Sequence, residues 1–231
     1  MHKFFQVSHH TLTAVKPHPM PAIVWLHGLG DSGRGWSHLK GELGLKGVQY
    51  TFPDAPVNPV SCNGGYEMTS WMDLENIPVA LGDKNDLKGV TASAALVHAA
   101  LDAVVAKMPS TEVVLGGFSQ GGAMALFAGY SYSKPLGGIV SFSGWSPLTK
   151  TDEATFISDL KAGANAQTPC FIGHGSEDNV VLPECGERAA KALEEAGVKD
   201  VSYSTYRMAH SSHPAETDAL AKWVSEKLKL S

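Results

Sequence analysis

The sequence predicts an α/β fold in which a mostly parallel central sheet carries helices on both faces. Short, nearly continuous apolar runs recur along the 231 residues, as expected for strands that are covered on both faces. Segments with helical spacing lie between these runs, and such alternation is typical of a parallel sheet. The 24 glycines and 13 prolines are consistent with the many turns that this arrangement needs.

The individual elements follow from these patterns. The expected strands are 22–26, 48–52, 112–118, 138–142, 170–173 and 201–206. The expected helices are 90–108, 120–130, 183–196 and 215–230. Pro109 stops the first helix, and Gly197 is a C-terminal signal for the third. The segment 53–88 has no clean period, so it is either a functional lid or binding loop, or a surface loop with its own hydrophobic plug.

Composition indicates one domain, residues 1–231, and excludes several functions. The hydrophobic fraction of 43% suffices for one core, and the net charge of -5 argues against a nucleic-acid partner. The three cysteines, Cys62, Cys170 and Cys185, have no paired spacing, which favours a reducing, cytoplasmic location. No signal peptide or run of 18 apolar residues is evident, so we expect at most transient membrane contact. We expect a monomer or a weak homodimer.

A nucleophile is predicted at Ser119. The run Gly117-Phe118-Ser119-Gln120-Gly121 matches G-x-S-x-G and lies between an expected strand and an expected helix. In the α/β-hydrolase fold the nucleophilic serine occupies a strained strand-to-helix turn, where large neighbours would clash. The alternative is a glycine-rich turn with a chance serine, but the strand before it and the helix after it favour the nucleophile.

Two backbone N–H groups are candidates for an oxyanion hole. This fold uses one N–H from the residue after the nucleophile and one from a loop after an early strand. Gln120 provides the first, and Leu29 is the candidate for the second because its flanking glycines let the backbone approach a substrate. We expect His27, next to this loop, to brace it rather than to transfer protons.

An acid and a histidine should follow Ser119 in that order. Asp178 comes just after the expected strand 170–173, and Glu177 is its competitor. His210 and His213 both follow the last expected strand. His210 lies nearer the strand end, whereas His213 precedes a proline that fits the start of the final helix, so we expect Asp178 and His210 to complete a catalytic triad.

Three further histidines, His9, His10 and His18, lie close together in the sequence. No carboxylate or cysteine accompanies them to complete a ligand set, so we expect no metal site. Acyl transfer through a serine uses a covalent intermediate on the side chain itself. We therefore expect neither a metal nor an organic cofactor.

Taken together, several motifs resemble one family, the acyl-protein thioesterases, also called the phospholipase/carboxylesterase family. The likeness runs from about residue 20 to the end, and no single motif carries it. The matching runs are Leu26-His27-Gly28-Leu29-Gly30-Asp31-Ser32-Gly33, Pro53-Asp54-Ala55-Pro56, Asn63-Gly64-Gly65, Ser70-Trp71-Met72-Asp73, Gly116-Gly117-Phe118-Ser119-Gln120-Gly121-Gly122, Ser143-Gly144-Trp145 and His174-Gly175.

The resemblance implies a cytosolic serine hydrolase that cleaves palmitoyl-type thioesters from protein cysteines, with acylated proteins, lysophospholipids or small esters as substrates. It implies the same triad and oxyanion residues, and it places Trp71 and Trp145 near the entrance and acyl groove. Met68 joins them as a substrate contact because it is one of the apolar residues of 53–88. The alternatives are a small-ester carboxylesterase, a lysophospholipase, or a catalytically silent binding module with this fold.

Overall fold

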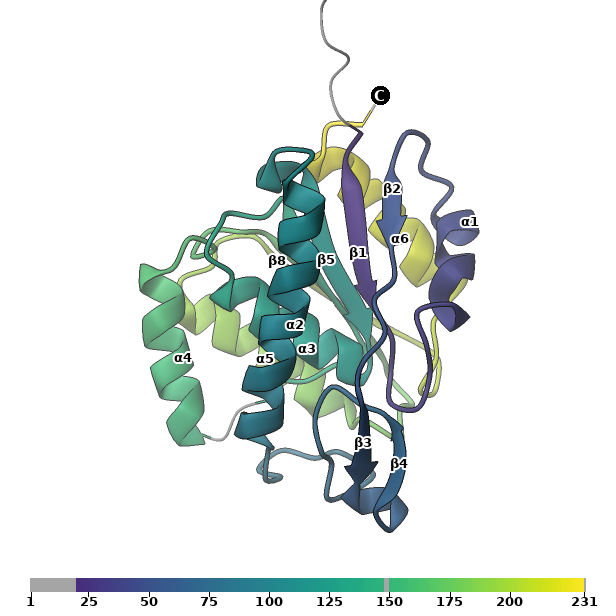
Figure 1. Ribbon diagram of the computed structural model, residues 1–231, viewed down its shortest axis with the longest axis vertical. Helices are drawn as coiled ribbons and strands as arrows, with labels where there is room; N and C mark the ends of the chain where they lie inside the picture. Colours follow the sequence, from purple (N-terminus) through teal and green to yellow (C-terminus); the bar gives the residue numbers. More distant parts are fainter. Residues whose placement is uncertain (1–19, 148–149, 231) are drawn as a thin grey trace, which may run out of the picture.

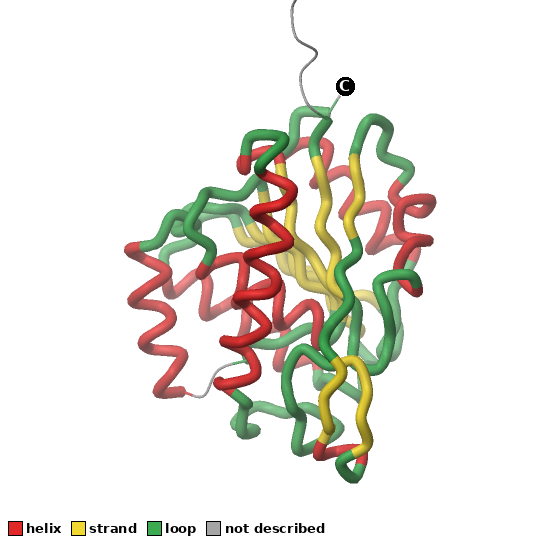
Figure 2. The backbone as a smooth tube through the Cα atoms, in the orientation of Figure 1, coloured by secondary structure: helices red, strands yellow, loops and turns green. Residues whose placement is uncertain are grey.

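A six-stranded, fully parallel sheet forms the centre of the computed structural model, which describes residues 20–147 and 150–230 (Figures 1 and 2). His9, His10 and His18 lie outside these ranges. The strand order is β2-β1-β5-β6-β7-β8. The strands are β1 (Ala22–Leu26), β2 (Gln49–Thr51), β5 (Val113–Phe118), β6 (Gly138–Phe142), β7 (Cys170–Gly175) and β8 (Val201–Tyr206). The predicted α/β class is confirmed.

Helices cover both faces of the sheet (Figure 1). One face carries α2 (Leu87–Val105), α3 (Gln120–Ser131), α4 (Lys150–Ala162) and α5 (Pro183–Ala196). The other carries α1 (Leu39–Leu43) and α6 (Pro214–Lys227). Alternate residues of each strand point to opposite faces, so an inner strand covered on both sides needs apolar or small residues throughout. The inner strands β1, β6 and β7 are accordingly buried along their whole length, whereas the edge strands β2 and β8 are only partly buried.

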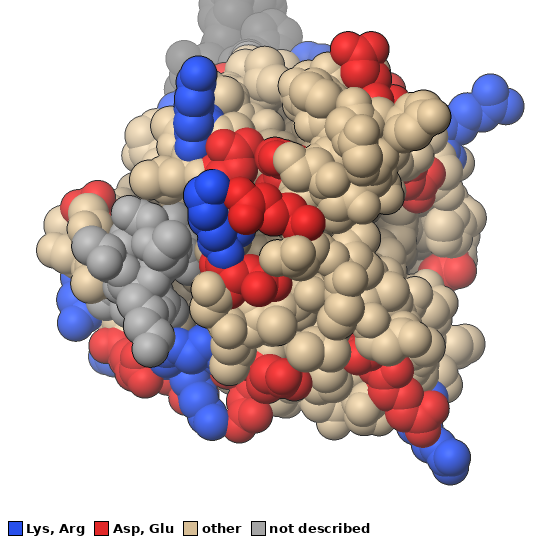
Figure 3. All heavy atoms as spheres, turned by 90° about the horizontal axis from the view of Figure 1, so that it is seen from below, with Lys and Arg blue, Asp and Glu red and all other residues tan. Residues whose placement is uncertain are grey.

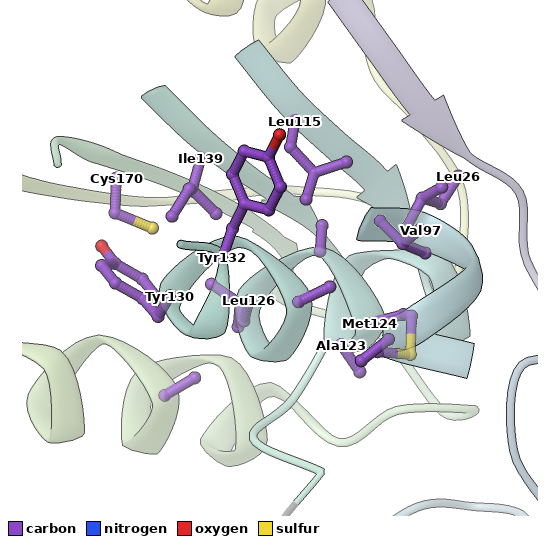
Figure 4. Close-up of a cluster of buried hydrophobic side chains, with 14 of the residues drawn as sticks. Leu26, Val97, Leu115, Ala123, Met124, Leu126, Tyr130, Tyr132, Ile139 and Cys170 are labelled. Atoms are coloured by element: carbon purple, nitrogen blue, oxygen red, sulfur yellow. The ribbon is translucent and has the colours of Figure 1, made fainter. Parts of the chain in front are cut away.

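The larger core lies around α3 (Figure 4). Met124 of α3 and Val97 of α2 are fully buried near one another, and Leu115 of β5 and Ile139 of β6 belong to the same core. Burying one such aliphatic side chain stabilises the fold by roughly 1.5–3 kcal/mol. Since α3 begins directly after Ser119, this packing also fixes where the candidate nucleophile stands.

Helix α2 alone among the described helices is long and apolar enough to cross a membrane by length and composition. In this fold its Val90, Ala94, Val97 and Leu101 are instead buried in the core. The helix therefore has the role of an ordinary sheet-covering helix here.

The segment 53–88 contains regular structure that the sequence did not predict. Strands β3 (Val57–Val60) and β4 (Tyr66–Thr69) form an antiparallel hairpin below the sheet, and α2 already begins at Leu87 (Figure 2). Each strand has four residues, and β3 contains Pro59, so no alternating pattern was visible. Helix α1 is too short, and α4 too polar, to show a clear helical period.

Close packing joins the start of α3 to the end of β1. A Cβ atom added at Gly121 would lie 2.3 Å from the carbonyl oxygen of Leu26 and 2.5 Å from that of His27. Backbone atoms cannot move aside cheaply, so only glycine fits at this position. The close approach brings the loop after β1 beside Ser119 and Gln120.

We predict that Gly121→Ala destabilises the protein by about 1–3 kcal/mol, the usual cost of overpacking a core. Gly41→Ala is the matched control: Gly41 lies within α1, and an added Cβ there meets nothing within 4 Å. It should stabilise by about 0.5–1 kcal/mol because alanine favours the helix. Urea unfolding measures the free energy of unfolding of both variants. Equal changes in this free energy for Gly121→Ala and Gly41→Ala would refute the packing argument.

Candidate active site

Ser119 lies on the sharp turn between β5 and α3. Its backbone has φ 56° and ψ -121°, a left-handed conformation that serine rarely adopts. The Ser119 N–H donates to the carbonyl of Phe142 at 2.7 Å, and the Ser119 carbonyl accepts from the N–H of Ala123 at 3.0 Å. These bonds fix the strained turn from the neighbouring strand and from the helix.

A chain of hydrogen bonds leads from Ser119 to a carboxylate. His210 Nε2 lies 2.8 Å from Ser119 Oγ, and His210 Nδ1 lies 2.8 Å from Asp178 Oδ2. Asp178 follows β7 and His210 follows β8, so parallel strands bring all three residues to the same edge of the sheet. The His210 ring also packs on Phe118, with 4.8 Å between ring centroids. This arrangement can remove a proton from the serine and return it to a leaving group.

Asp178 is buried but held in its charged form. Burial alone would raise the pKa of the carboxyl, but hydrogen bonds from His210 and from two backbone N–H groups outweigh it and lower the pKa below its ordinary value. The N–H groups of Val180 and Val181 each donate to Asp178 Oδ1 at 2.9 Å. The ionised carboxylate can therefore orient His210 and stabilise its positive charge.

His174 holds the loop that follows Asp178, a role that sequence reasoning missed. Its ring is fully buried, and burial lowers the pKa of His174, which keeps it neutral. Its Nε2 donates to the carbonyl of Val181 at 2.9 Å and lies 3.6 Å from Asp178 Oδ2. The available signal was its position at the end of β7, four residues before the acid.

The competing residues lie elsewhere. Glu177 forms an exposed ion pair with Arg207 at 3.0 Å. His213 is the N-cap of α6, where its Nδ1 accepts from the N–H of Ala215 at 3.1 Å. Neither side chain takes part in the hydrogen-bonded chain that ends at Ser119.

The two candidate oxyanion donors, the backbone N–H groups of Leu29 and Gln120, lie on either side of the Ser119 turn. Gln120 is the first residue of α3, so its N–H has no acceptor within the helix. Across the described part of the chain, neither this N–H nor that of Leu29 makes a hydrogen bond. His27 is buried; its Nδ1 donates to the carbonyl of Gly28 at 2.7 Å, and its Nε2 accepts from the N–H of Ala55 at 3.0 Å. With both ring nitrogens engaged, His27 braces the loop.

A cavity of about 240 Å³ opens beside Ser119 and His210. Its apolar lining includes Leu74, Ile77, Val79, Trp145 and Val181. Part of this wall is fixed because Val79 pairs with the loop after Asp178: its N–H donates to Val180, and its carbonyl accepts from Leu182. Seen from below, a broad uncharged area lies beside groups of acidic and basic side chains (Figure 3).

Of the three expected substrate contacts, Trp145 lines this cavity, and Met68 and Trp71 are not among its lining residues. Trp71 is 1% exposed, and its Nε1 donates to the carbonyl of His27 at 2.9 Å. Met68 lies beside Gly30 in the loop after β1. In the described ranges, no group of three histidine, cysteine, aspartate or glutamate side chains is placed to hold a metal ion.

Glu216 is a second buried acid near the site, at the start of α6. It is fully buried over Gly173 of β7, and neither carboxyl oxygen has a hydrogen-bond partner among the described residues. Burial raises the pKa of Glu216 to about 8. The side chain is therefore a neutral acid at pH 7, unlike Asp178.

The parallel sheet, the strained serine turn and the chain order Ser119, Asp178, His210 define the α/β-hydrolase class. The family model described as Phospholipase/Carboxylesterase matches residues 9–228. The chain belongs to the phospholipase/carboxylesterase family, and the predicted resemblance is confirmed.

Named relatives and a solved structure agree over nearly the whole chain. The chain is 36% identical over 211 residues to carboxylesterase SOBER1 of Arabidopsis thaliana, with 90% of each chain covered. It is 34% identical over 225 residues to acyl-protein thioesterase 1 of Emericella nidulans, with 91% of each covered. The crystal structure of Zea mays acyl-protein thioesterase 2 has a TM-score of 0.80 at 33% identity and covers 94% of this chain and 97% of that one.

We predict that the stability difference between Glu216→Gln and the wild type grows with pH. Between the ordinary pKa of 4.5 and the raised value of about 8, the unfolded chain releases this proton while the folded chain keeps it. Wild-type stability should fall through this window by about 1.4 kcal/mol per pH unit from this group alone. The neutral amide cannot titrate, so the variant lacks that slope.

Urea unfolding of both proteins at pH 5, 6, 7 and 8 provides the measurement. Subtracting the two curves removes the contributions of all other titrating groups. A difference that stays constant from pH 5 to pH 8 would show that Glu216 is not a buried neutral acid.

Proposed function

We propose that this hydrolase cleaves acyl thioesters and related carboxylic esters through an acyl-enzyme intermediate on Ser119. The observation that carries the proposal is the hydrogen-bonded chain from Ser119 Oγ through His210 to Asp178, with 2.8 Å at each step. A chance serine turn would not have both an ordered base and an ionised carboxylate behind that base. The same geometry argues against a silent binding module.

The first half of the reaction forms the acyl-enzyme. His210 Nε2 takes the proton from Ser119 Oγ as the oxygen attacks the acyl carbonyl carbon. The backbone N–H groups of Leu29 and Gln120 then stabilise the tetrahedral oxyanion, and removing one such donor typically costs about 3 kcal/mol of transition-state stabilisation. When the carbon–sulfur or carbon–oxygen bond breaks, His210 gives its proton to the leaving thiol or alcohol.

The second half releases the acid. His210 takes a proton from water, which attacks the acyl-enzyme carbonyl, and the same two N–H groups stabilise the second oxyanion. Collapse of this intermediate returns the proton to Ser119 Oγ and frees the carboxylic acid. Asp178 stays ionised throughout and orients the imidazole.

Family relatives and the apolar cavity support an acylated protein as substrate, with a palmitoyl-type acyl group. A second candidate, a small-ester carboxylesterase, is favoured by the size of the cavity: about 240 Å³ is below the roughly 300–1,000 Å³ of common ligand pockets. The three unpaired cysteines support the cytoplasm as the place of action.

Ser119→Ala is expected to lower kcat by several orders of magnitude while the thermal unfolding midpoint stays close to that of the wild type. Loss of a triad serine in related chemistry costs on the order of a millionfold. Hydrolysis of a thioester, followed with a thiol reagent, and labelling with a fluorophosphonate probe measure the effect. Near-normal turnover in a folded Ser119→Ala variant would refute the proposed mechanism.

His210→Gln and His213→Gln form a matched pair. His210→Gln should remove nearly all activity and slow fluorophosphonate labelling of Ser119, because the serine loses its base. His213→Gln should keep most of the wild-type rate, because His213 only caps α6. The reverse pattern would identify His213 as the base and would contradict the geometry described above.

Chain-length dependence separates the two candidate substrates. Each methylene that enters the cavity should raise kcat/KM by about fourfold, from roughly 0.8 kcal/mol of transfer free energy. A rise that continues to palmitoyl supports the thioesterase, and a maximum at short chains supports the small-ester enzyme. Ile77→Ala should flatten the rise because Ile77 lines the cavity, whereas Leu81→Ala should not.

Leu81 is a suitable control because it belongs to the same insertion and is similarly exposed, 55% against 46% for Ile77, without lining the cavity. Thioesters and oxygen esters from acetyl to palmitoyl should be measured side by side. Equal profiles for wild type and Ile77→Ala would place the acyl group elsewhere.

A further inference from the structure

The four residues Thr69–Met72, at the end of β4, contact both loops that carry the candidate oxyanion donors. On the side of Leu29, the carbonyl of Thr69 accepts from the N–H of Gly30 at 2.8 Å, and Thr69 Oγ1 donates to the carbonyl of Asp31 at 2.6 Å. Figure 1 shows the loop after β1 descending to the β3–β4 hairpin. Both bonds are made within two residues of Leu29.

The same segment is fixed to the nucleophile elbow by the side chain of Gln120. This side chain is fully buried; its Oε1 accepts from the N–H of Trp71 at 2.7 Å, and its Nε2 donates to the carbonyl of Met72 at 2.8 Å. Gln120 therefore presents its backbone N–H beside Ser119 while its amide holds the residues that follow Thr69.

The loop after β1 needs such an anchor. Leu29 lies between two glycines, and Gly30 has φ +73°, so this backbone is intrinsically free to rearrange. An oxyanion donor is effective only when its N–H points, at about 2.7–3.1 Å, to where the negative oxygen forms. A displacement of the Leu29 N–H relative to that of Gln120 would weaken stabilisation of the transition state without filling the cavity.

We propose that Thr69 is a positioning residue for the oxyanion hole. Its hydroxyl and carbonyl hold Asp31 and Gly30, while the following peptides are held by Gln120, so one short segment of the insertion sets the spacing of the two donors. Thr69 is not among the residues that line the cavity beside Ser119, and it acts through the Leu29 loop. This inference rests on the proposed function of Ser119 and adds a role for the insertion beyond forming the wall of the acyl cavity.

The direct test compares Thr69→Val, which keeps the branched shape but loses the hydroxyl, with Thr69→Ser, which keeps the hydroxyl. Thr69→Val should lower kcat about 3- to 10-fold, the effect of one hydrogen bond, with little change in KM. Thr69→Ser should restore most of the loss. Ser61→Ala is the control, because Ser61 is in the same insertion and, within the described residues, its hydroxyl bonds to Asp73 alone.

A tetrahedral analogue distinguishes positioning from general loosening. An alkylboronic acid forms an adduct with the serine oxygen and places an oxygen in the hole, whereas the straight-chain alcohol of the same length occupies only the cavity. Thr69→Val should raise the inhibition constant of the boronic acid by the same factor by which it lowers kcat/KM. The inhibition constant of the alcohol should not change. Ser61→Ala should change neither.

Three results would overturn the inference: kcat of Thr69→Val within twofold of wild type, equal weakening of both inhibitors, or no recovery in Thr69→Ser. If Thr69→Val fails to fold, Thr69→Ala is measured in the same way. Fluorophosphonate labelling of wild-type Ser119 distinguishes failure of the proposed function from failure of the inference about Thr69. Absent labelling refutes the proposed function and the inference together, whereas normal labelling with an unchanged Thr69→Val refutes the inference alone.

Discussion

The backbone of Ser119 is the constraint on which the site depends, because its left-handed conformation makes the sharp turn between β5 and α3 from which the hydroxyl reaches His210. Such a conformation costs about 1–3 kcal/mol for a non-glycine residue, so it persists only where the surroundings hold it. Here the Phe142 carbonyl binds the Ser119 N–H, the buried helix α3 fixes the far side, and Gly121 allows contact with the end of β1. The stability of the core thus maintains the strain at the turn.

The other residues of the candidate site lie beside Ser119 because the carboxyl ends of parallel strands lie at one edge of the sheet. Asp178 and His210 follow β7 and β8, and Leu29 follows β1. The insertion 53–88 then joins these loops to one another: Val79 pairs with the loop after Asp178, and Thr69 pairs with the loop around Leu29. The strands of the sheet therefore place the residues of the candidate site at one edge. The insertion 53–88 fixes the relative positions of the loops that carry them and forms part of the cavity wall.

The sequence was most informative where local pattern and function coincide. The strand 22–26 and the helix 183–196 match the structure because apolar runs and a terminal glycine mark them directly. Ser119, Asp178 and His210 could be predicted as a group because the fold fixes the order of such residues along the chain, and the structure brings the three together. The hairpin β3–β4 has too few residues for a visible period. Trp71 was placed near the acyl groove by the family resemblance alone, and sequence does not show that its side chain is buried against the loop after β1. Trp71 forms hydrogen bonds with His27 and Gln120, which are distant in the sequence, so only the tertiary fold determines these contacts.

In the proposed mechanism the acyl group passes through a covalent bond to Ser119 Oγ. Rapid acid quench during turnover of an octanoyl thioester, followed by intact-protein and peptide mass spectrometry, tests it most directly. We predict a transient mass increase of one octanoyl group located on the peptide that contains Ser119. An acyl group found on Cys62 or any other residue, or turnover with no covalent adduct under conditions in which acyl-enzyme formation outpaces its hydrolysis, would contradict it.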